Sequence, residues 1–178
     1  MEDLAQAVRN DLRWVSIDQA SIKSGIAYWR GSALEKTELF KATDKKFSKR
    51  LVQIREKITY LITKEDIRFV TIEGIQLEDI EDQSKDISID TFRKLSMVQG
   101  VFVETLEELS IPYDIVHPSV WKSSLGVLKG NGQEKVKRQE QKKRTLEEIK
   151  RFYPIDISED EADAAGIGLY QIQKIPLW

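Results

Sequence analysis

The stretch Trp14-Val15-Ser16-Ile17-Asp18 is a short, mostly apolar run that ends in an acid. Its aromatic and β-branched residues predict a buried β-strand. Two further runs of this kind follow closely, over residues 24–29 and 33–40, and the pair Gly31-Ser32 between them favours a tight turn. Three strands joined by such short links predict an antiparallel meander.

Downstream of this meander, the sequence alternates between helical and strand-like patterns. Apolar residues recur at helical spacing in some segments and run together in others. Helices are predicted over residues 5–12, 45–63, 91–109, 134–152 and 158–172, and strands over residues 69–73 and 113–117. The polar segment 74–88 is predicted as a loop, and residues 119–132 are mixed in character. The last helix is expected to begin with a capping box, in which Ser158 and Glu161 bond to each other's backbone.

The order of these elements predicts an α/β fold. Three strands come first, and single helices then separate the later strands, which favours parallel pairing through crossovers. We therefore expect a five-stranded mixed sheet flanked by helices. The chain has 178 residues, enough for one domain with a sizeable core, so a single domain over residues 1–178 is expected.

Composition excludes several classes of functional site. The chain has no cysteine, which rules out disulfides and any cysteine-ligated zinc or iron–sulfur centre. His117 is the only histidine, which argues against a histidine-rich metal site or a Ser-His-Asp triad. No apolar run is long enough to cross a bilayer, and residues 1–13 lack the pattern of a signal peptide. We therefore expect a cytoplasmic protein without a membrane partner.

Charge is distributed unevenly along the chain. Residues 122–151 contain ten Lys or Arg and four Glu, although the net charge of the whole chain is −2. A basic stretch beside an acidic remainder suits a protein that binds phosphates with one surface and metal ions with another. The structural alternative is a solvated, lysine-rich helix.

Four acidic residues lie where an open α/β sheet places functional side chains. Asp18 and Glu73 each end an apolar strand, and such strand ends border the crevice where ligands bind. Asp160 and Asp163 are three residues apart near the start of the last predicted helix, so they share one face of it. Structural alternatives exist, since Asp18 also suits a turn and Asp160 a helix N-terminus.

Carboxylates gathered in this way point to a metal site. They repel one another and resist full ionisation, and a divalent cation removes that cost. Oxygen ligands suit Mg²⁺ or Mn²⁺. Two such ions about 4 Å apart can activate water and stabilise the leaving oxygen of a phosphodiester. The four acids therefore predict metal-dependent phosphodiester hydrolysis.

Four segments, taken in order, resemble the RuvC Holliday junction resolvases of the RNase H-like superfamily. They are residues 15–28 (Val-Ser-Ile-Asp-Gln-Ala-Ser-Ile-Lys-Ser-Gly-Ile-Ala-Tyr), 70–74 (Val-Thr-Ile-Glu-Gly), 117–126 (His-Pro-Ser-Val-Trp-Lys-Ser-Ser-Leu-Gly) and 160–168 (Asp-Glu-Ala-Asp-Ala-Ala-Gly-Ile-Gly). The resemblance runs from Trp14 to Ile172, nearly the whole chain. Any one motif could arise by chance, but four in this order and spacing form a much more specific signal.

The resemblance implies an RNase H-like nuclease domain that acts as a homodimer. Its activity would be that of a crossover junction endodeoxyribonuclease, which cleaves four-way DNA junctions with Mg²⁺ in DNA recombination and repair. The catalytic and metal-binding acids carry over to Asp18, Glu73, Asp160 and Asp163. The family's catalytic or DNA-contacting lysines carry over to Lys122 and Lys143, with Lys135 or Lys137 as alternatives to the second. The match to Lys143 puts Leu146, Ile149 and Phe152 on the family's helix face. The predicted helix over residues 91–109 is either the dimer face or only part of the core.

Two departures from the family pattern suggest a divergent, phage-type member with relaxed specificity, working in a bacterial host's cytosol. Gly74-Ile75-Gln76 follows the second acid where cellular members have an aromatic residue, and residues 78–82 are acidic. Gln19-Ala20 also replaces the usual Pro-Gly after the first acid. Two rival functions stay open, a nuclease of the same superfamily acting on RNA–DNA hybrids or flaps, and a junction-binding protein that does not cut. An actin-like ATPase is a poorer match, because the chain is short for two lobes and has no glycine-rich phosphate loop.

Overall fold

The computed structural model describes residues 13–75, 89–129 and 137–174. The predicted helix over residues 5–12 and most of the segment 74–88 lie outside the described residues. In chain order the elements are β1 (Arg13–Asp18), β2 (Lys23–Arg30), β3 (Ala33–Lys41), α2 (Phe47–Lys64), β4 (Phe69–Glu73), α3 (Ile89–Glu108), β5 (Tyr113–Val116), α4 (Pro118–Ser124), α5 (Arg138–Phe152) and α6 (Glu159–Lys174).

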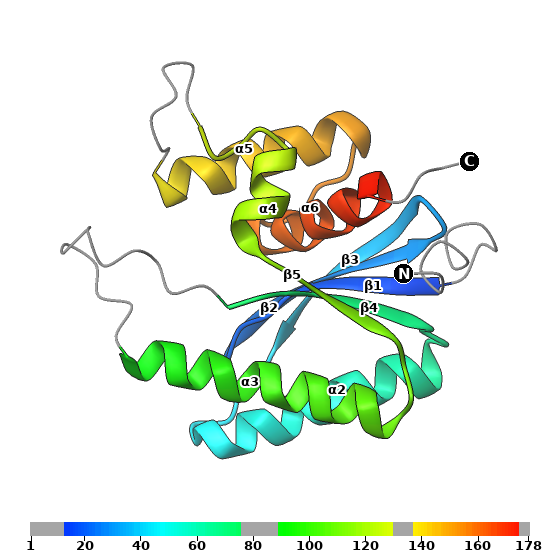
Figure 1. Cartoon of the computed structure of the whole chain (residues 1–178), viewed down its shortest axis with the longest axis vertical. Helices are drawn as coiled ribbons and strands as arrows, with labels where there is room; N and C mark the ends of the chain where they lie inside the picture. Colours follow the sequence, from blue (N-terminus) through cyan, green and yellow to red (C-terminus); the bar gives the residue numbers. More distant parts are fainter. Residues whose placement is uncertain (1–12, 76–88, 130–136, 175–178) are drawn as a thin grey trace.

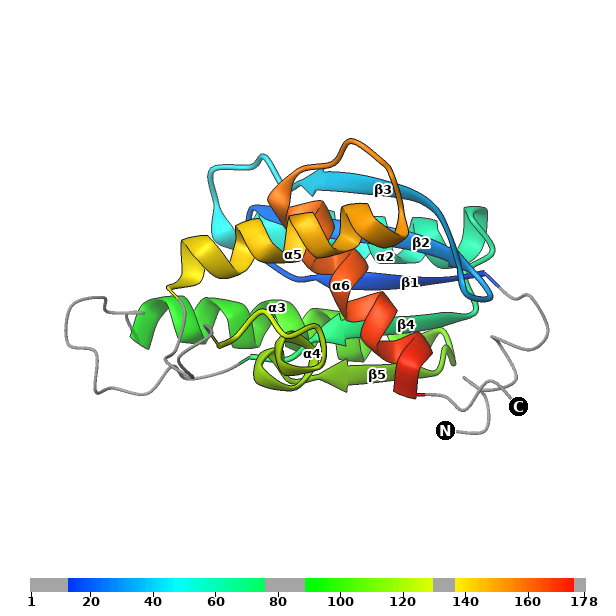
Figure 2. The same ribbon diagram turned by 90° about the horizontal axis from the view of Figure 1, so that it is seen from above.

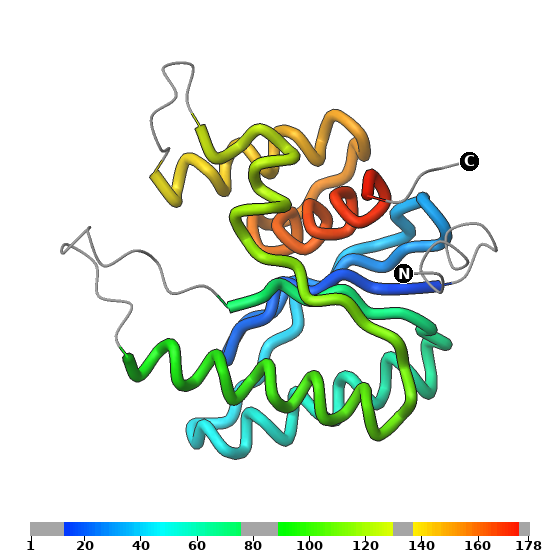
Figure 3. The backbone as a smooth tube through the Cα atoms, viewed as in Figure 1, coloured from blue at the N-terminus to red at the C-terminus, as the bar shows by residue number. Residues whose placement is uncertain are grey.

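The described strands form one mixed sheet in the order β3-β2-β1-β4-β5. β1, β2 and β3 pair antiparallel, which is the predicted meander. β1 also pairs with β4, and β4 with β5, both parallel, because a helix precedes each of the later strands and carries the chain across the sheet. The backbone trace shows β1 in the middle of the sheet (Figure 3). The predicted α/β fold, with a five-stranded mixed sheet flanked by helices, is confirmed.

Helices cover the sheet on both faces (Figure 1). α2 and α3 lie on one face, and α4, α5 and α6 lie on the other, as the view from above also shows (Figure 2). Val15 and Ile17 of β1 belong to the core cluster beneath α2 and α3, whereas Trp14 belongs to the cluster beneath α5 and α6. A strand that is buried on both faces needs a nearly continuous apolar run, which explains the sequence of β1.

α6 approaches the sheet closely because small residues line the contact. A Cβ atom at Gly25 of β2 would lie 2.0 Å from the carbonyl oxygen of Asp160, so only glycine fits there. A Cβ atom at Gly168 would lie 2.4 Å from the indole of Trp29. The predicted capping box at the start of α6 is confirmed, since Glu161 Oε2 accepts from the Ser158 backbone N–H at 3.0 Å. The Gly25 contact and the capping box fix the first turn of α6 beside the end of β1, and the Gly168 contact holds a later turn against Trp29.

α3 contributes one face to the core and leaves another in solvent. Val98, Phe102 and Leu106 are buried in the cluster between the sheet and α2, which favours the core alternative for this helix. Met97 is 54% exposed. The predicted boundaries differ elsewhere, because α5 begins at Arg138, after an N-cap at Lys137, and α4 occupies a segment for which no helix was predicted. None of the described helices has the length and apolar character needed to cross a membrane.

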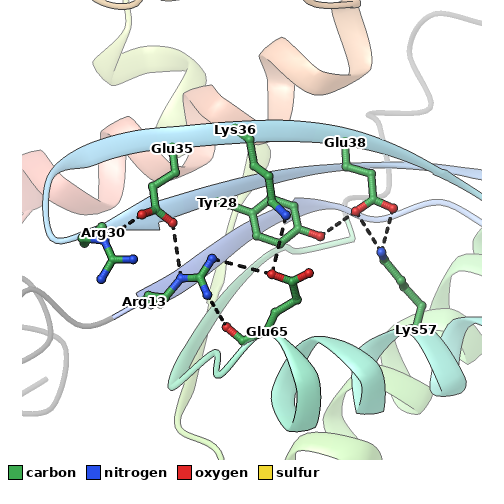
Figure 4. Close-up of polar contacts among 8 residues, drawn as sticks. All are labelled: Arg13, Tyr28, Arg30, Glu35, Lys36, Glu38, Lys57 and Glu65. Carbon is green, nitrogen blue, oxygen red and sulfur yellow. Dashed lines mark hydrogen bonds and ion pairs between the residues drawn. The ribbon is translucent and has the colours of Figure 1, made fainter.

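Charged residues along β3 and α2 form a network in which the acids are paired with bases (Figure 4). Glu38 accepts hydrogen bonds from Tyr28 Oη at 2.5 Å and from Lys57 Nζ at 2.6 and 2.8 Å. Burial alone would raise the pKa of Glu38, but the bonds from Lys57 and Tyr28 hold it below its ordinary value. The further ion pairs of this network are Arg13–Glu35, Arg30–Glu35, Arg13–Glu65 and Lys36–Glu65.

Candidate active site

The two acids at the strand ends leave the sheet at the same edge. Ile17 of β1 pairs in parallel register with Ile72 of β4, so the residues that follow them, Asp18 and Glu73, are neighbours. Glu73 is held from two sides. Its backbone carbonyl accepts from Gln19 Nε2 at 2.7 Å, and its Oε1 accepts from Trp121 Nε1 at 3.0 Å.

Asp18 is partly buried among other acids. Burial, the charges of Glu73 and Asp163 and a hydrogen bond with Glu73 together raise the pKa of Asp18 well above its ordinary value, although the charge of Lys142 lowers it. Like charges are therefore crowded at this edge of the sheet, and a cation would relieve their repulsion.

Asp163 completes a group of three acids from three different elements. It lies on the face of α6 that meets the sheet, and it is 4% exposed. Burial raises the pKa of Asp163 to about 6; Glu73 and Asp160 also raise it, while Lys122 and Lys142 lower it. Its Oδ1 is buried and has no hydrogen-bond partner among the described residues. Asp160, one turn earlier, is half-buried and stands at the rim.

Two lysines face these acids. Lys142 Nζ of α5 lies 2.5 Å from Asp160 Oδ1 and 3.8 Å from Asp163 Oδ2. Burial alone would lower the pKa of Lys142, but its bond to Asp160 and the charges of Asp163, Asp160 and Asp18 raise it, so its ammonium group stays charged. The charge of Lys122, on α4, lowers the pKa of Asp163. The Lys122 Nζ lies 5.2 Å from the centre of the Trp121 ring.

The α5 lysine that meets the acids differs from the one predicted. The prediction of Lys143 requires Leu146, Ile149 and Phe152 to share the packed face of this helix. The buried residues of α5 are instead Gln141, Thr145 and Ile149, and Phe152 is 52% exposed. Successive residues of a helix are rotated by about 100°. With Gln141, Thr145 and Ile149 packed, Lys142 lies beside the acids, whereas Lys143 lies on the opposite side of the helix and is exposed. Of the two alternatives, Lys137 is exposed at the N-cap and Lys135 lies outside the described residues.

Sequence reasoning missed two residues that support the acids. Gln19 was noted only as a departure from a family motif, yet it is 7% exposed and joins Glu73 to Gln99 of α3, with its Nε2 3.1 Å from Gln99 Oε1. In the sequence Trp121 stands out only as part of a motif, yet it is fully buried and its Nε1 donates to Glu73 Oε1. A glutamine directly after an acid that ends an apolar strand is the sequence signal that could have revealed Gln19.

The four acids fit a divalent cation by their chemistry. Their donors are all carboxylate oxygens, which suit hard cations such as Mg²⁺. Within the described part of the chain, no three His, Cys, Asp or Glu side chains are arranged as a ready-made metal site. The excess of negative charge around Asp18 and the unpartnered Oδ1 of Asp163 are the two features that a cation would relieve.

Comparison with solved structures places the chain in a known fold. The chain is similar to RuvC of Thermus thermophilus in complex with a Holliday junction substrate, with 14% identity, a TM-score of 0.66, and coverage of 89% of this chain and 92% of that one. This is a RuvC-like, RNase H-like fold. The yeast mitochondrial Holliday junction resolvase Ydc2 matches with 14% identity, a TM-score of 0.57 and coverage of 97% and 85%.

A viral resolvase has the same RuvC-like fold. The fowlpox virus resolvase, in complex with substrate Holliday junction DNA, matches with 12% identity, a TM-score of 0.52 and coverage of 92% and 98%. No protein-family model matches the chain, and neither does any curated protein sequence. At such low identities the similarity establishes the RuvC-like fold and leaves the activity to be argued from the site.

Proposed function

We propose that this protein is a structure-selective DNA endonuclease that cleaves Holliday junctions and other branched DNA. The observation that carries the proposal is the convergence of Asp18, Glu73 and Asp163, from β1, β4 and α6, beside two lysines. The RuvC-like fold supports the choice of substrate, because two of the similar structures contain Holliday junction DNA.

The proposed cofactor is Mg²⁺, for which Mn²⁺ would substitute. Asp18, Glu73, Asp160 and Asp163 would hold it. A divalent cation in such a site lowers the pKa of water and stabilises the leaving oxygen of a phosphodiester. The raised pKa values of Asp18 and Asp163 support this role, because carboxylates that resist ionisation alone ionise readily beside a cation.

The lysines have separate proposed roles. Lys122 and Lys142 would neutralise the charge that develops on the phosphate during cleavage, since both lie beside Asp163. The exposed residues Lys143, Lys150 and Arg151 on α5 would bind the DNA backbone by charge alone. α5 therefore combines a catalytic lysine with a phosphate-binding surface.

A homodimer is the proposed working form. A four-way junction has two strands to cut, and two copies related by a two-fold axis would place one site at each. The side of α3 that carries the exposed Met97 is the proposed contact. One nuclease domain over residues 1–178 and a cytoplasmic location, in a bacterial host if the gene belongs to a phage, remain predictions.

The test is a cleavage assay on a synthetic four-way junction with Mg²⁺. Wild-type protein is compared with Asp18→Asn and Glu73→Gln, and with Asp66→Asn as the matched control. Asp66 lies before β4, at the opposite end of the sheet from Glu73, and its positive φ of 55° suits asparagine. We expect the wild type and Asp66→Asn to nick the junction, and both site variants to lose activity on the order of 10³-fold or more.

Substrate arms separate the rival functions. Duplex DNA, a flap and an RNA–DNA hybrid are assayed beside the junction. Preferential cutting of the hybrid would replace junction cleavage with a ribonuclease activity. Tight junction binding without nicks in Mg²⁺ or Mn²⁺ would indicate a binding protein, and cleavage that survives Asp18→Asn would defeat the assigned site.

A further inference from the structure

Trp121 connects the candidate acids to the helical layer above them. It lies on α4, one turn after Pro118, and its side chain has no exposed surface. Its indole N–H donates to Glu73 Oε1 at 3.0 Å, and the two residues are 48 positions apart in the chain. The bond therefore exists only because the fold places α4 over the end of β4.

The indole ring is fixed in place by the residues around it. A Cβ atom at Gly166 of α6 would lie 2.8 Å from Cζ3 of Trp121, so the ring fills the space where α6 has no side chain. Gly166 is one helical turn beyond Asp163 on α6. The ring is thereby held against the helix that carries one acid while its N–H holds another.

Glu73 lies among like charges. Its backbone pairs with Val116 of β5, but the negative charges of Asp18 and Asp163 repel its side chain. An indole N–H is only a donor and does not titrate, so it attracts the carboxylate without removing its charge. The bond is made to Oε1 and does not involve Oε2.

We propose that Trp121 is a positioning residue that holds the Glu73 carboxylate ready for a divalent cation. This inference rests on the proposed nuclease function and adds to it a residue that touches neither DNA nor metal. Groups that bond to metal ligands typically change metal affinity or activity by about 10–100-fold when they are removed. The same indole ring also makes a cation–π contact with Lys122, whose Nζ lies 5.2 Å from the ring centre.

The first test compares two matched tryptophan variants of the full chain. Trp121→Phe keeps an aromatic ring but removes the N–H donor. Trp14→Phe makes the same change at another fully buried tryptophan, whose Nε1 donates to the Gly31 carbonyl at 2.9 Å, far from the acids. We expect Trp121→Phe to weaken Mn²⁺ binding, measured by calorimetry without DNA, by about 10-fold or more. It should lower kcat on the junction with little change in KM, and Trp14→Phe should change neither.

A double-mutant cycle shows whether Trp121 acts through Glu73. In a Glu73→Gln background, Trp121→Phe should have no further effect on Mn²⁺ affinity, because the group it positions is no longer a carboxylate. An equal loss of affinity in both backgrounds, or wild-type Mn²⁺ affinity in Trp121→Phe, would overturn the proposal.

Nuclear magnetic resonance of ¹⁵N-labelled tryptophan tests the bond in wild-type protein, even if Trp121→Phe does not fold. The Trp121 indole resonance should move when Mg²⁺ is added and in Glu73→Gln, while that of Trp14 should stay in place. A Trp121 resonance unaffected by Glu73→Gln would refute the inference. Failure of the nuclease function is distinguishable, because it would appear as wild-type protein that cuts no DNA whatever these binding measurements show.

Discussion

Two groups of acidic residues in the described part of the chain differ in how their carboxylates are paired. In the network of Figure 4, Glu38 is bonded by Lys57 and Tyr28, and its pKa is held low. At the carboxyl ends of β1 and β4, burial and neighbouring acids raise the pKa values of Asp18 and Asp163. A balanced cluster stabilises the fold, whereas an unbalanced cluster costs stability and marks a candidate for function.

Asp163→Asn should produce the largest contrast between the clusters. We expect junction cleavage to fall on the order of 10³-fold or more. Stability should change in the opposite direction, because the variant removes a buried charge. With a folded pKa of about 6 against an ordinary value of 3.8, the free energy of unfolding at pH 8 should rise on the order of 2 kcal/mol, measured by urea denaturation without metal. A variant that loses both activity and stability would contradict this account.

The same variant defines the pH dependence of the unbalanced cluster. Because the folded pKa of Asp163 lies above its unfolded value, its contribution to stability is fully present below about pH 3.8 and is lost as pH rises through about 6. Between these values the slope of stability against pH should be more negative in wild type than in Asp163→Asn. The contribution of Glu38 depends on pH in the opposite direction. Because its folded pKa is lowered, this contribution is present above the unfolded pKa and is lost as pH falls through the folded pKa.

Lys142→Gln should reduce the rate of cleavage, whereas Lys143→Gln should weaken DNA binding. Lys142 contacts Asp160 and Asp163, so its loss should reduce the cleavage rate about 10²-fold. Lys143 is exposed on the other side of α5, so its loss should weaken junction binding slightly and lower the salt dependence of binding by about one ion. Rates under saturating junction and binding curves at several salt concentrations measure the two effects. A larger rate defect in Lys143→Gln than in Lys142→Gln would instead support Lys143 as the catalytic lysine.

Glu38→Gln should have the smallest effect, confined to stability. The side chain is partly exposed, so losing its charge-assisted bonds to Lys57 and Tyr28 should lower the free energy of unfolding by about 1 kcal/mol. Junction cleavage should be unchanged within two-fold or so of wild type, about 0.4 kcal/mol in activation free energy. A marked loss of activity would show that the balanced cluster also serves the site.

The sheet and the acidic residues could be predicted because their signals are local. The apolar run of β1 and the Phe69–Glu73 run identify their own strands, and an acid at the end of each is visible without knowing its neighbours. Parallel pairing then brings the two acids together. Whether they hold a metal ion stays a prediction.

The supporting residues could not be predicted, because their roles depend on contacts between distant segments. α4 is only seven residues long, and its Trp121 finds Glu73 through the packing of α4 against α6. Lys142 and Lys143 are adjacent, so the choice between them depends on which face of α5 packs against the protein. The spacing of three between Leu146, Ile149 and Phe152 did not identify that face. Gln141, Thr145 and Ile149, spaced by four, define the face that packs, but two of them are polar.

Gly25 limits how the candidate acids can be spaced at the edge of the sheet. Because the Asp160 carbonyl occupies the space that any side chain at this position would need, the distance between the helix that carries Asp163 and the strand beside Asp18 is set by a residue with no chemical group of its own. A single methyl group there would act as a spacer, widening the gap between two carboxylates while leaving both in the sequence. The separation of the acids is thus set by the contact between β2 and α6, independently of the acids themselves.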